Sequence, residues 1–123
     1  MSKKRILYIE DNFENRLFVR RVLESMGFDL IEAEDGMAGI DAAQAELPDL
    51  ILMDIGLPGI DGLETTARLK QMPDLEGVPV IALTANAMKG DAERCLAAGC
   101  DGYLTKPIGV TDLREKVLRY LNS

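Results

Sequence analysis

The chain has 123 residues, of which 47% are hydrophobic and 28% are charged, and it carries a net charge of −7. This length suits one domain, expected over residues 1–123, and no apolar run approaches the roughly 20 residues that a membrane span needs. The acidic balance and the scattered basic residues argue against binding to nucleic acid, and we expect no membrane partner either. The missing signal-peptide pattern favours a cytoplasmic protein.

Short apolar runs alternate with helical patterns along the chain. The predicted strands cover residues 5–9, 28–33, 49–54, 78–84 and 101–105. The predicted helices cover residues 13–26, 36–46, 62–72, 87–98 and 110–121. Typical helix stops follow three of these helices, at Gly27, Pro48 and Gly99. This order predicts a (βα)₅ doubly wound α/β fold, with a five-stranded parallel sheet covered by helices on both faces.

The first predicted helix has apolar residues on two sides. The arc expected to face the sheet consists of Phe18, Val19, Val22, Leu23 and Met26. Phe13 and Leu17 project to the opposite, outer side. Such an exposed pair is either ordinary surface or a place where a partner docks, and the pattern leaves both interpretations open.

Polar residues stand where four of the predicted strands end. They are Glu10 with Asp11, then Asp54, Thr84 and Lys106. Ligands of an open parallel sheet bind beyond the carboxyl ends of its strands, so we expect these side chains to meet there. Three carboxylates repel one another unless a cation joins them. A hard divalent ion with oxygen ligands meets this need, and we expect Mg²⁺.

Asp54 is the expected centre of the chemistry, because it ends an apolar strand just before the turn-forming residues 55–62. A phosphoryl group that approaches this carboxylate needs a metal and an ammonium group to screen both negative charges. Lys106 supplies the ammonium group, and the Thr84 hydroxyl can donate to an oxygen of the anion. The same groups suit an aspartyl phosphate, although spacing alone does not distinguish phosphate from a carboxylate ligand.

These motifs resemble the receiver domain of two-component response regulators over essentially the whole chain. Glu10-Asp11 resembles the acidic pair of the family, and Asp54 in Asp-Ile-Gly-Leu-Pro-Gly-Ile-Asp-Gly resembles its phosphoacceptor. The remaining matches are the switch hydroxyl with its small neighbour, the switch aromatic, and the lysine with a cis peptide bond. They fall on Thr84-Ala85, Tyr103 and Lys106-Pro107.

The resemblance implies the flavodoxin-like strand order 2-1-3-4-5 and a ligand set for Mg²⁺. The ion would be held by Asp11, Asp54 and the Gly56 carbonyl, and through water by Glu10. The phosphoryl group would be contacted by Thr84, Ala85 and Lys106. Residues two positions beyond Asp54 and Thr84 tune dephosphorylation in the family, and here they are Gly56 and Asn86.

The resemblance also implies the partners. A histidine kinase or a histidine phosphotransfer protein would give its phosphoryl group to Asp54, after which Thr84 moves toward the phosphate and Tyr103 turns inward. We expect the donor to dock near Phe13, Leu17 and Ile108. A protein target would read the face formed by the fourth helix, the fifth strand and the fifth helix. The chain would not be an enzyme, since it takes part only in its own phosphorylation and dephosphorylation.

Two further features concern the predicted fourth helix. Gly90 either weakens its first turns, by about 1 kcal/mol relative to Ala, or lies in the loop that enters it. Cys95 and Cys100 lack metal-ligand spacing, and the chain contains no His. We therefore expect two reduced thiols and no zinc site.

Several other functions remain as alternatives. Residues 85–91 also resemble receivers attached to hybrid sensor kinases, so the chain could be an excised domain, although Met1 and the closing helix favour a stand-alone protein. A pseudo-receiver would bind partners without phosphorylation. A haloacid-dehalogenase-type phosphatase needs a second acid where Gly56 stands. A flavodoxin-type flavin carrier needs a hydroxyl-rich loop after the first strand, where this chain has Glu-Asp-Asn-Phe-Glu.

Overall fold

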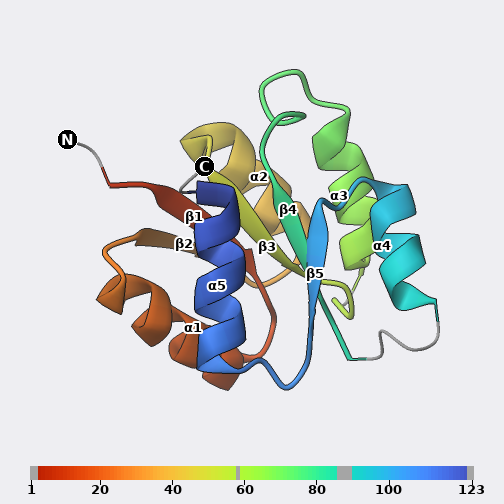
Figure 1. Cartoon of the computed structure of the whole chain (residues 1–123). Helices are drawn as coiled ribbons and strands as arrows, with labels where there is room; N and C mark the ends of the chain where they lie inside the picture. The colour runs from red at the N-terminus through yellow and green to blue at the C-terminus, as the bar shows by residue number, and fades with distance from the viewer. Residues whose placement is uncertain (1–2, 58, 86–89, 122–123) are drawn as a thin grey trace.

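Strands and helices alternate along the computed structural model, which describes residues 3–57, 59–85 and 90–121. The strands are β1 (Arg5–Ile9), β2 (Asp29–Ala33), β3 (Leu50–Asp54), β4 (Val80–Thr84) and β5 (Gly102–Thr105). The helices are α1 (Phe13–Ser25), α2 (Gly36–Glu46), α3 (Gly62–Lys70), α4 (Asp91–Ala98) and α5 (Val110–Leu121). All strand pairs are parallel and the order is β2-β1-β3-β4-β5, which confirms the predicted fold class and strand order (Figure 1).

Helices cover both faces of the sheet, and each face has its own core (Figure 1). Helices α1 and α5 pack on one face, where the buried residues include Ile6, Tyr8, Val19, Leu23, Leu83, Leu113 and Val117. Helices α2, α3 and α4 pack on the other, where they include Leu7, Ile9, Ile40, Met53, Leu69, Ala82 and Cys95. Successive strand residues point to opposite faces, so a strand buried on both sides has a continuous apolar run.

Three helices begin directly at a capping side chain. Asn12, Asp35 and Asp61 precede α1, α2 and α3, and each side chain accepts a hydrogen bond of 2.8 Å from the amide three residues further on. These caps satisfy amides that have no partner within the helix. Helix α1 begins soon after β1 ends, and the first residue of α3 lies close to the end of β3, where the predicted acidic residues lie.

The element boundaries differ from the predicted ones mainly at strand and helix ends. Four strands begin one or two residues later than predicted, and α3 ends at Lys70. Helix α4 begins at Asp91, and residues 87–89 of the predicted helix lie outside the described residues. Gly90 precedes the helix with φ of 81°, so it belongs to the entry loop. This left-handed conformation suits glycine, because it has no Cβ.

The expected buried face of α1 was wrong at one position. Phe18 is 39% exposed, whereas Arg16, which we did not assign to the core, is only 8% exposed. The buried stripe of α1 consists of Arg16, Val19, Val22 and Leu23, and Met26 packs against it half-buried. The apolar periodicity of the helix gives no reason to bury an arginine, but the Arg16 guanidinium has ion-pair partners in Glu32 and Glu34. Phe13 is 58% exposed and Leu17 is half-buried.

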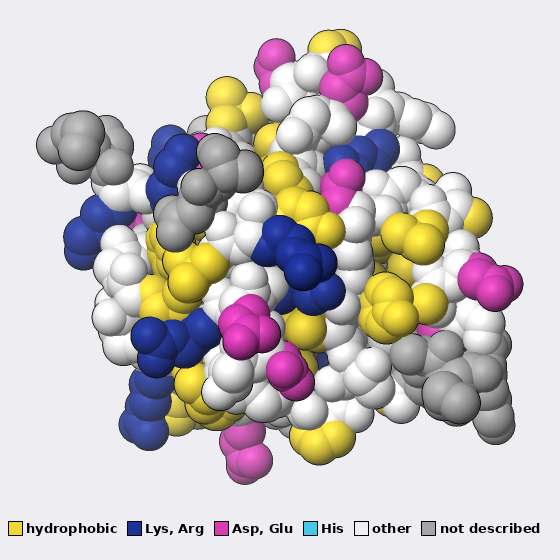
Figure 2. Space-filling model, in the orientation of Figure 1, with side chains coloured by type: hydrophobic (Ala, Val, Ile, Leu, Met, Phe, Trp, Pro, Cys, Tyr) yellow, Lys and Arg dark blue, Asp and Glu magenta, His cyan; other side chains and the backbone are white. Residues whose placement is uncertain are grey.

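Both thiols are buried and free, as predicted. Burial raises the pKa of Cys100 to about 11 and also raises the pKa of Cys95. Among the described residues, no helix is both long and apolar enough to cross a membrane. Figure 2 shows acidic and basic side chains interspersed over the face that carries α5, without a continuous basic field.

Candidate functional site

Three carboxylates meet where the buried strands β1 and β3 end. Asp54 is the last residue of β3 and Glu10 follows β1 directly, and these residues are only 4% and 1% exposed. Asp11 is exposed, and a carboxylate oxygen of each acid lies within 4.8 Å of the other two. β1 and β3 are neighbours in the parallel sheet, so their carboxyl ends bring the acids together as predicted.

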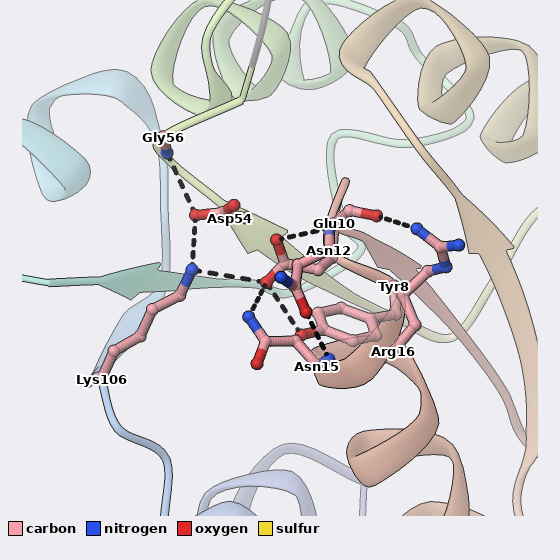
Figure 3. Close-up of polar contacts among 8 residues, drawn as sticks. All are labelled: Tyr8, Glu10, Asn12, Asn15, Arg16, Asp54, Gly56 and Lys106. Atoms are coloured by element: carbon pink, nitrogen blue, oxygen red, sulfur yellow. Dashed lines mark hydrogen bonds and ion pairs between the residues drawn. The ribbon is translucent and has the colours of Figure 1, made fainter.

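Lys106 joins two of these acids (Figure 3). Its Nζ lies 3.0 Å from Asp54 Oδ1 and 3.3 Å from Glu10 Oε1. The residue follows β5, so its side chain reaches across the end of β4. Burial lowers the pKa of Lys106, but the hydrogen bonds and charges of Asp54 and Glu10 outweigh burial, and the net pKa is raised. Lys106 is therefore held as an ammonium group, and its peptide bond to Pro107 is cis.

Glu10 is held from several sides. Its Oε1 accepts from the Tyr8 hydroxyl at 3.2 Å and from Asn15 Nδ2 at 3.3 Å, and its Oε2 accepts from the Asn12 amide at 3.4 Å (Figure 3). Burial, together with the Asp54 carboxylate, raises the pKa of Glu10, while the Lys106 ammonium opposes this shift. Burial also raises the pKa of the Tyr8 hydroxyl, so it is a proton donor.

Arg16 is a site residue that the sequence interpretation missed. Its Nη1 donates to the Glu10 carbonyl oxygen at 2.8 Å, and its guanidinium pairs with Glu32 at 3.5 Å and Glu34 at 3.3 Å. These bonds fix the backbone that leads into the acidic pair. A signal was present, because Arg16 lies three residues before the buried Val19 on the same side of α1.

Asp54 is packed closely by the turn that follows it. Its Oδ1 accepts from the Gly56 amide at 3.1 Å in addition to Lys106. Gly62, the first residue of α3, lies so near that a Cβ at this position would be 2.3 Å from the Asp54 carbonyl oxygen. Only glycine fits there without a backbone shift, so the start of α3 supports the end of β3 directly.

Thr84 ends β4 beside β3 and is fully buried. Its hydroxyl donates to Asp91 Oδ2 at 2.8 Å, and Asp91 Oδ1 accepts from Arg94 Nη1 at 3.0 Å. Asp91 was not among the predicted site residues, because sequence spacing does not indicate that the start of α4 folds back onto the end of β4. Tyr103 is half-buried and packs against the core beneath α2, α3 and α4.

A cleft of about 500 Å³ connects these groups. Its lining includes Glu10, Asp11, Asp54, Gly56, Ala85, Asp91, Arg94 and Lys106. Asn86, the position expected to tune dephosphorylation, lies outside the described residues. The structure thus brings together the predicted acids, the lysine and Ala85 in one open cleft, with Thr84 buried at its edge.

A second, mostly apolar groove of about 480 Å³ adjoins this cleft and shares Asn15 and Lys106 with it. It is lined by Tyr8, Asn15, Phe18, Val19, Lys106, Pro107 and Ile108. Ile108 was predicted as part of a partner surface, whereas Phe18 was not. Phe13 and Leu17 are not among the lining residues of this groove. The partner surface at Phe13, Leu17 and Ile108 stays a prediction.

Residues 6–118 match the family model of the response regulator receiver domain. The chain belongs to this family. It is 44% identical over 118 residues to the polar-differentiation response regulator DivK of Brucella anthropi, and the match covers 96% of each chain. Membership in the receiver family makes the chain a component of two-component signalling and disfavours the phosphatase and flavin-carrier alternatives.

Solved structures agree with this assignment. The receiver domain of the sensor histidine kinase PA1611 from Pseudomonas aeruginosa has a TM-score of 0.92 at 37% identity, over 99% of this chain and 100% of that one. That structure has a magnesium ion coordinated in its active-site cleft. A CheY-like receiver domain protein from Methanospirillum hungatei has a TM-score of 0.90 at 30% identity, over 98% of this chain and 95% of that one.

Proposed function

We propose that Asp54 accepts a phosphoryl group from a phosphohistidine of a histidine kinase or a histidine phosphotransfer protein. The observation that carries this proposal is the Lys106 ammonium group, 3.0 Å from Asp54 Oδ1 and 3.3 Å from Glu10 Oε1 in an open cleft. An ammonium group at this place lowers the electrostatic cost of bringing a phosphoryl dianion to a carboxylate. It is equally suited to the acyl phosphate that the transfer produces.

In the proposed reaction, a carboxylate oxygen of Asp54 forms a bond to phosphorus while the bond from phosphorus to the donor's ring nitrogen breaks. The imidazole leaves with the electron pair of that bond, and the aspartate becomes an acyl phosphate. The Gly56 amide and Lys106 both donate to Asp54 Oδ1, which orients the carboxylate before attack. We propose that Lys106, the Ala85 amide and the Thr84 hydroxyl then contact the phosphoryl oxygens.

The acidic cluster fits a magnesium ion. Glu10, Asp11 and Asp54 each offer a carboxylate oxygen within 4.8 Å of the other two, and hard oxygen ligands are those that Mg²⁺ prefers. Asp11, Asp54 and the Gly56 carbonyl would hold the ion, and Glu10 would do so through water. When bound, Mg²⁺ would screen the negative charges of the carboxylate and the phosphoryl group. The magnesium in the receiver domain of PA1611 supports this assignment.

We further propose that the chain acts as a switch and not as an enzyme with a separate substrate. Phosphorylation would favour an arrangement in which Thr84 approaches the phosphate and Tyr103 turns inward. A protein target would read the face of α4, β5 and α5, where Leu96, Val110 and Leu118 are exposed. The phosphodonor would dock on the α1 side of the cleft, where the apolar groove beside Lys106 supports such contact.

Phosphorylation by acetyl phosphate, followed by intact mass measurement, tests the proposal. We expect a phosphate adduct that requires Mg²⁺, is cleaved by hydroxylamine and is lost in Asp54→Asn. Asp61→Asn is a matched control, since Asp61 lies near the same sheet edge but caps α3, and asparagine also caps helices. A folded wild type that acquires no adduct from several donors would support the pseudo-receiver alternative. An adduct that persists in Asp54→Asn would place the acceptor at another residue.

A further inference from the structure

The Thr84 hydroxyl donates its only proton to Asp91. The oxygen of Thr84 lies 2.8 Å from Asp91 Oδ2, and an ionised carboxylate can only accept hydrogen bonds. A phosphoryl group on Asp54 also presents acceptor oxygens. A hydroxyl has one proton, so Thr84 cannot give a full hydrogen bond to both anions at once.

Asp91 is well placed to hold this proton and also to release it. It is the first residue of α4, directly after the left-handed Gly90, and its side chain is largely shielded from solvent. Its other oxygen accepts from Arg94 Nη1 at 3.0 Å. If Thr84 leaves, Asp91 therefore keeps a cationic partner, which avoids the cost of an unpaired buried charge.

The cleft brings the competing groups into one space. Asp91 and Arg94 line it together with Asp54, Ala85 and Lys106. Thr84 ends β4 next to β3, and Asp54 pairs with Leu83, the residue before Thr84. Thr84 is therefore hydrogen-bonded to the start of α4, and its strand β4 lies directly beside β3, which ends in the phosphoacceptor Asp54.

We propose that Asp91 is a positioning residue that competes with the phosphoryl group on Asp54 for the hydroxyl proton of Thr84. The hydrogen bond between Thr84 and Asp91 stabilises the unphosphorylated arrangement, in which Thr84 does not contact the phosphoryl group. Breaking this bond reduces the free energy by which phosphorylation favours the active arrangement. Because Asp91 belongs to α4, breaking this bond also releases the start of that helix. The proposal rests on the proposed function, since it concerns how the phosphorylated state is reached.

The competition is measured with beryllofluoride, a stable mimic of a phosphoryl group, in the presence of Mg²⁺. Removing the competing acceptor in Asp91→Ala should tighten binding of beryllofluoride about tenfold, the usual size of a hydrogen bond to a charged group. Asp91→Asn should tighten it as well, because its amide can donate to the Thr84 oxygen and leave the hydroxyl proton available. Glu93→Ala is the matched control, since it removes an exposed acid from the same turn of α4 and should leave the affinity unchanged.

A double-mutant cycle with Thr84→Val distinguishes this role from a general effect of charge. Valine keeps the shape of threonine but has no proton to give, so Asp91→Ala should leave beryllofluoride affinity unchanged in the Thr84→Val background. If Asp91→Ala tightens binding equally in both backgrounds, or does not tighten it in wild type, the proposal is wrong. The free energies of unfolding of wild type, Asp91→Ala, Thr84→Val and the double variant, measured without beryllofluoride, should also show a coupling between Thr84 and Asp91.

These results are distinct from a failure of the proposed function. If wild type binds no beryllofluoride and acquires no phosphate, the proposed function fails, and the competition fails with it. If wild type is phosphorylated on Asp54 but the cycle shows no coupling, the proposed function stands and only the role of Asp91 is overturned.

The Thr84 methyl resonance, followed by NMR, provides a second readout of the competition between Asp91 and the phosphoryl group. It should move toward its beryllofluoride-bound position in free Asp91→Ala but not in free Glu93→Ala.

Discussion

The acidic side of the cleft, at the ends of β1 and β3, is built differently from its switch side, at the end of β4 and the start of α4. On the acidic side, Glu10 and Asp54 are buried, Lys106 bonds to both, and Arg16 holds the Glu10 carbonyl. On the switch side, Thr84 bonds to Asp91 at the start of α4, and within Asp91–Ala98 only Cys95 is buried.

The difference matches the two tasks of a receiver domain. Groups that take part in phosphoryl transfer act best when their positions are fixed before the reaction, because they then need no reorganisation. A switch needs an element whose two arrangements differ little in free energy, and a helix with few buried contacts is such an element. We therefore expect substitutions on the acidic side to cost more stability than those on the switch side.

The largest effect is expected from Arg16→Ala on the acidic side. This change removes the donor to the Glu10 carbonyl and leaves Glu32 without one of its cationic partners. Loss of one member of a buried ionic network should lower the free energy of unfolding by about 3 kcal/mol. Urea unfolding measures this cost. Arg20→Ala removes the more exposed partner of Glu32 and should cost about 1 kcal/mol or less. Equal costs for both variants would contradict the central role of Arg16.

Gly62→Ala should have the next largest effect. The added Cβ would meet the Asp54 carbonyl oxygen at 2.3 Å and the Ile55 Cα at 2.6 Å, so the backbone must shift. We expect a cost of about 2 kcal/mol in the free energy of unfolding and slower phosphorylation of Asp54 by acetyl phosphate. A variant as stable and as reactive as wild type would mean that the start of α3 does not fix Asp54.

Lys106→Met tests whether the Lys106 ammonium group competes with Mg²⁺ for the carboxylates of Glu10 and Asp54. Without it, Glu10 and Asp54 lose their shared partner, and the uncompensated charge should attract Mg²⁺ about tenfold more tightly. Phosphorylation should nevertheless decrease, because the new acyl phosphate has lost its ammonium partner. Calorimetric titration of Mg²⁺ and the acetyl phosphate assay measure the two effects. Weaker Mg²⁺ binding would show instead that Lys106 orients the metal ligands.

The smallest effect is expected from Gly90→Ala on the switch side. Gly90 has φ of 81°, and a Cβ there would meet nothing within 4 Å, so the only cost is backbone strain of about 1 kcal/mol. Gly77→Ala is the matched control, because a Cβ there also meets nothing within 4 Å and Gly77 is not among the residues with positive φ. Urea unfolding should show almost no loss for Gly77→Ala, and an equal loss for both variants would mean that strain at Gly90 is absent.

The positions of Glu10, Asp54, Thr84 and Lys106 were predictable from the sequence, because each ends or directly follows an apolar strand at its carboxyl end. In a parallel sheet all such ends lie at one edge, so the strand pattern alone brings these residues together. The spacing of these residues did not predict which anion the site binds. Phosphate, and the strand order 2-1-3-4-5, came from the resemblance to receiver domains, since local patterns do not say which strands pair.

The sequence interpretation failed at three positions for a common reason: it did not predict the roles of Arg16 and Asp91, and it placed Phe18 in the core. Burial of Arg16 depends on Glu32 and Glu34, which lie on and after another strand, and the role of Asp91 depends on the turn at Gly90 that brings α4 back to Thr84. Phe18 is apolar and was assigned to the core, but it lines the groove beside Lys106. Helical periodicity identifies an apolar side, but it contains no information about partners that are distant in the sequence.

The sequence by itself determined the alternation of strands and helices and the set of polar groups at one sheet edge, because both depend on local hydrophobic patterns and capping residues. The tertiary structure decided which of these groups touch. Lys106 reaches across the end of β4 to Asp54, and Thr84 bonds to Asp91 and thereby to α4. Hydrogen bonds and charge pairs depend on distances of a few ångströms between residues far apart in the chain, and only packing of the helices on the sheet sets those distances.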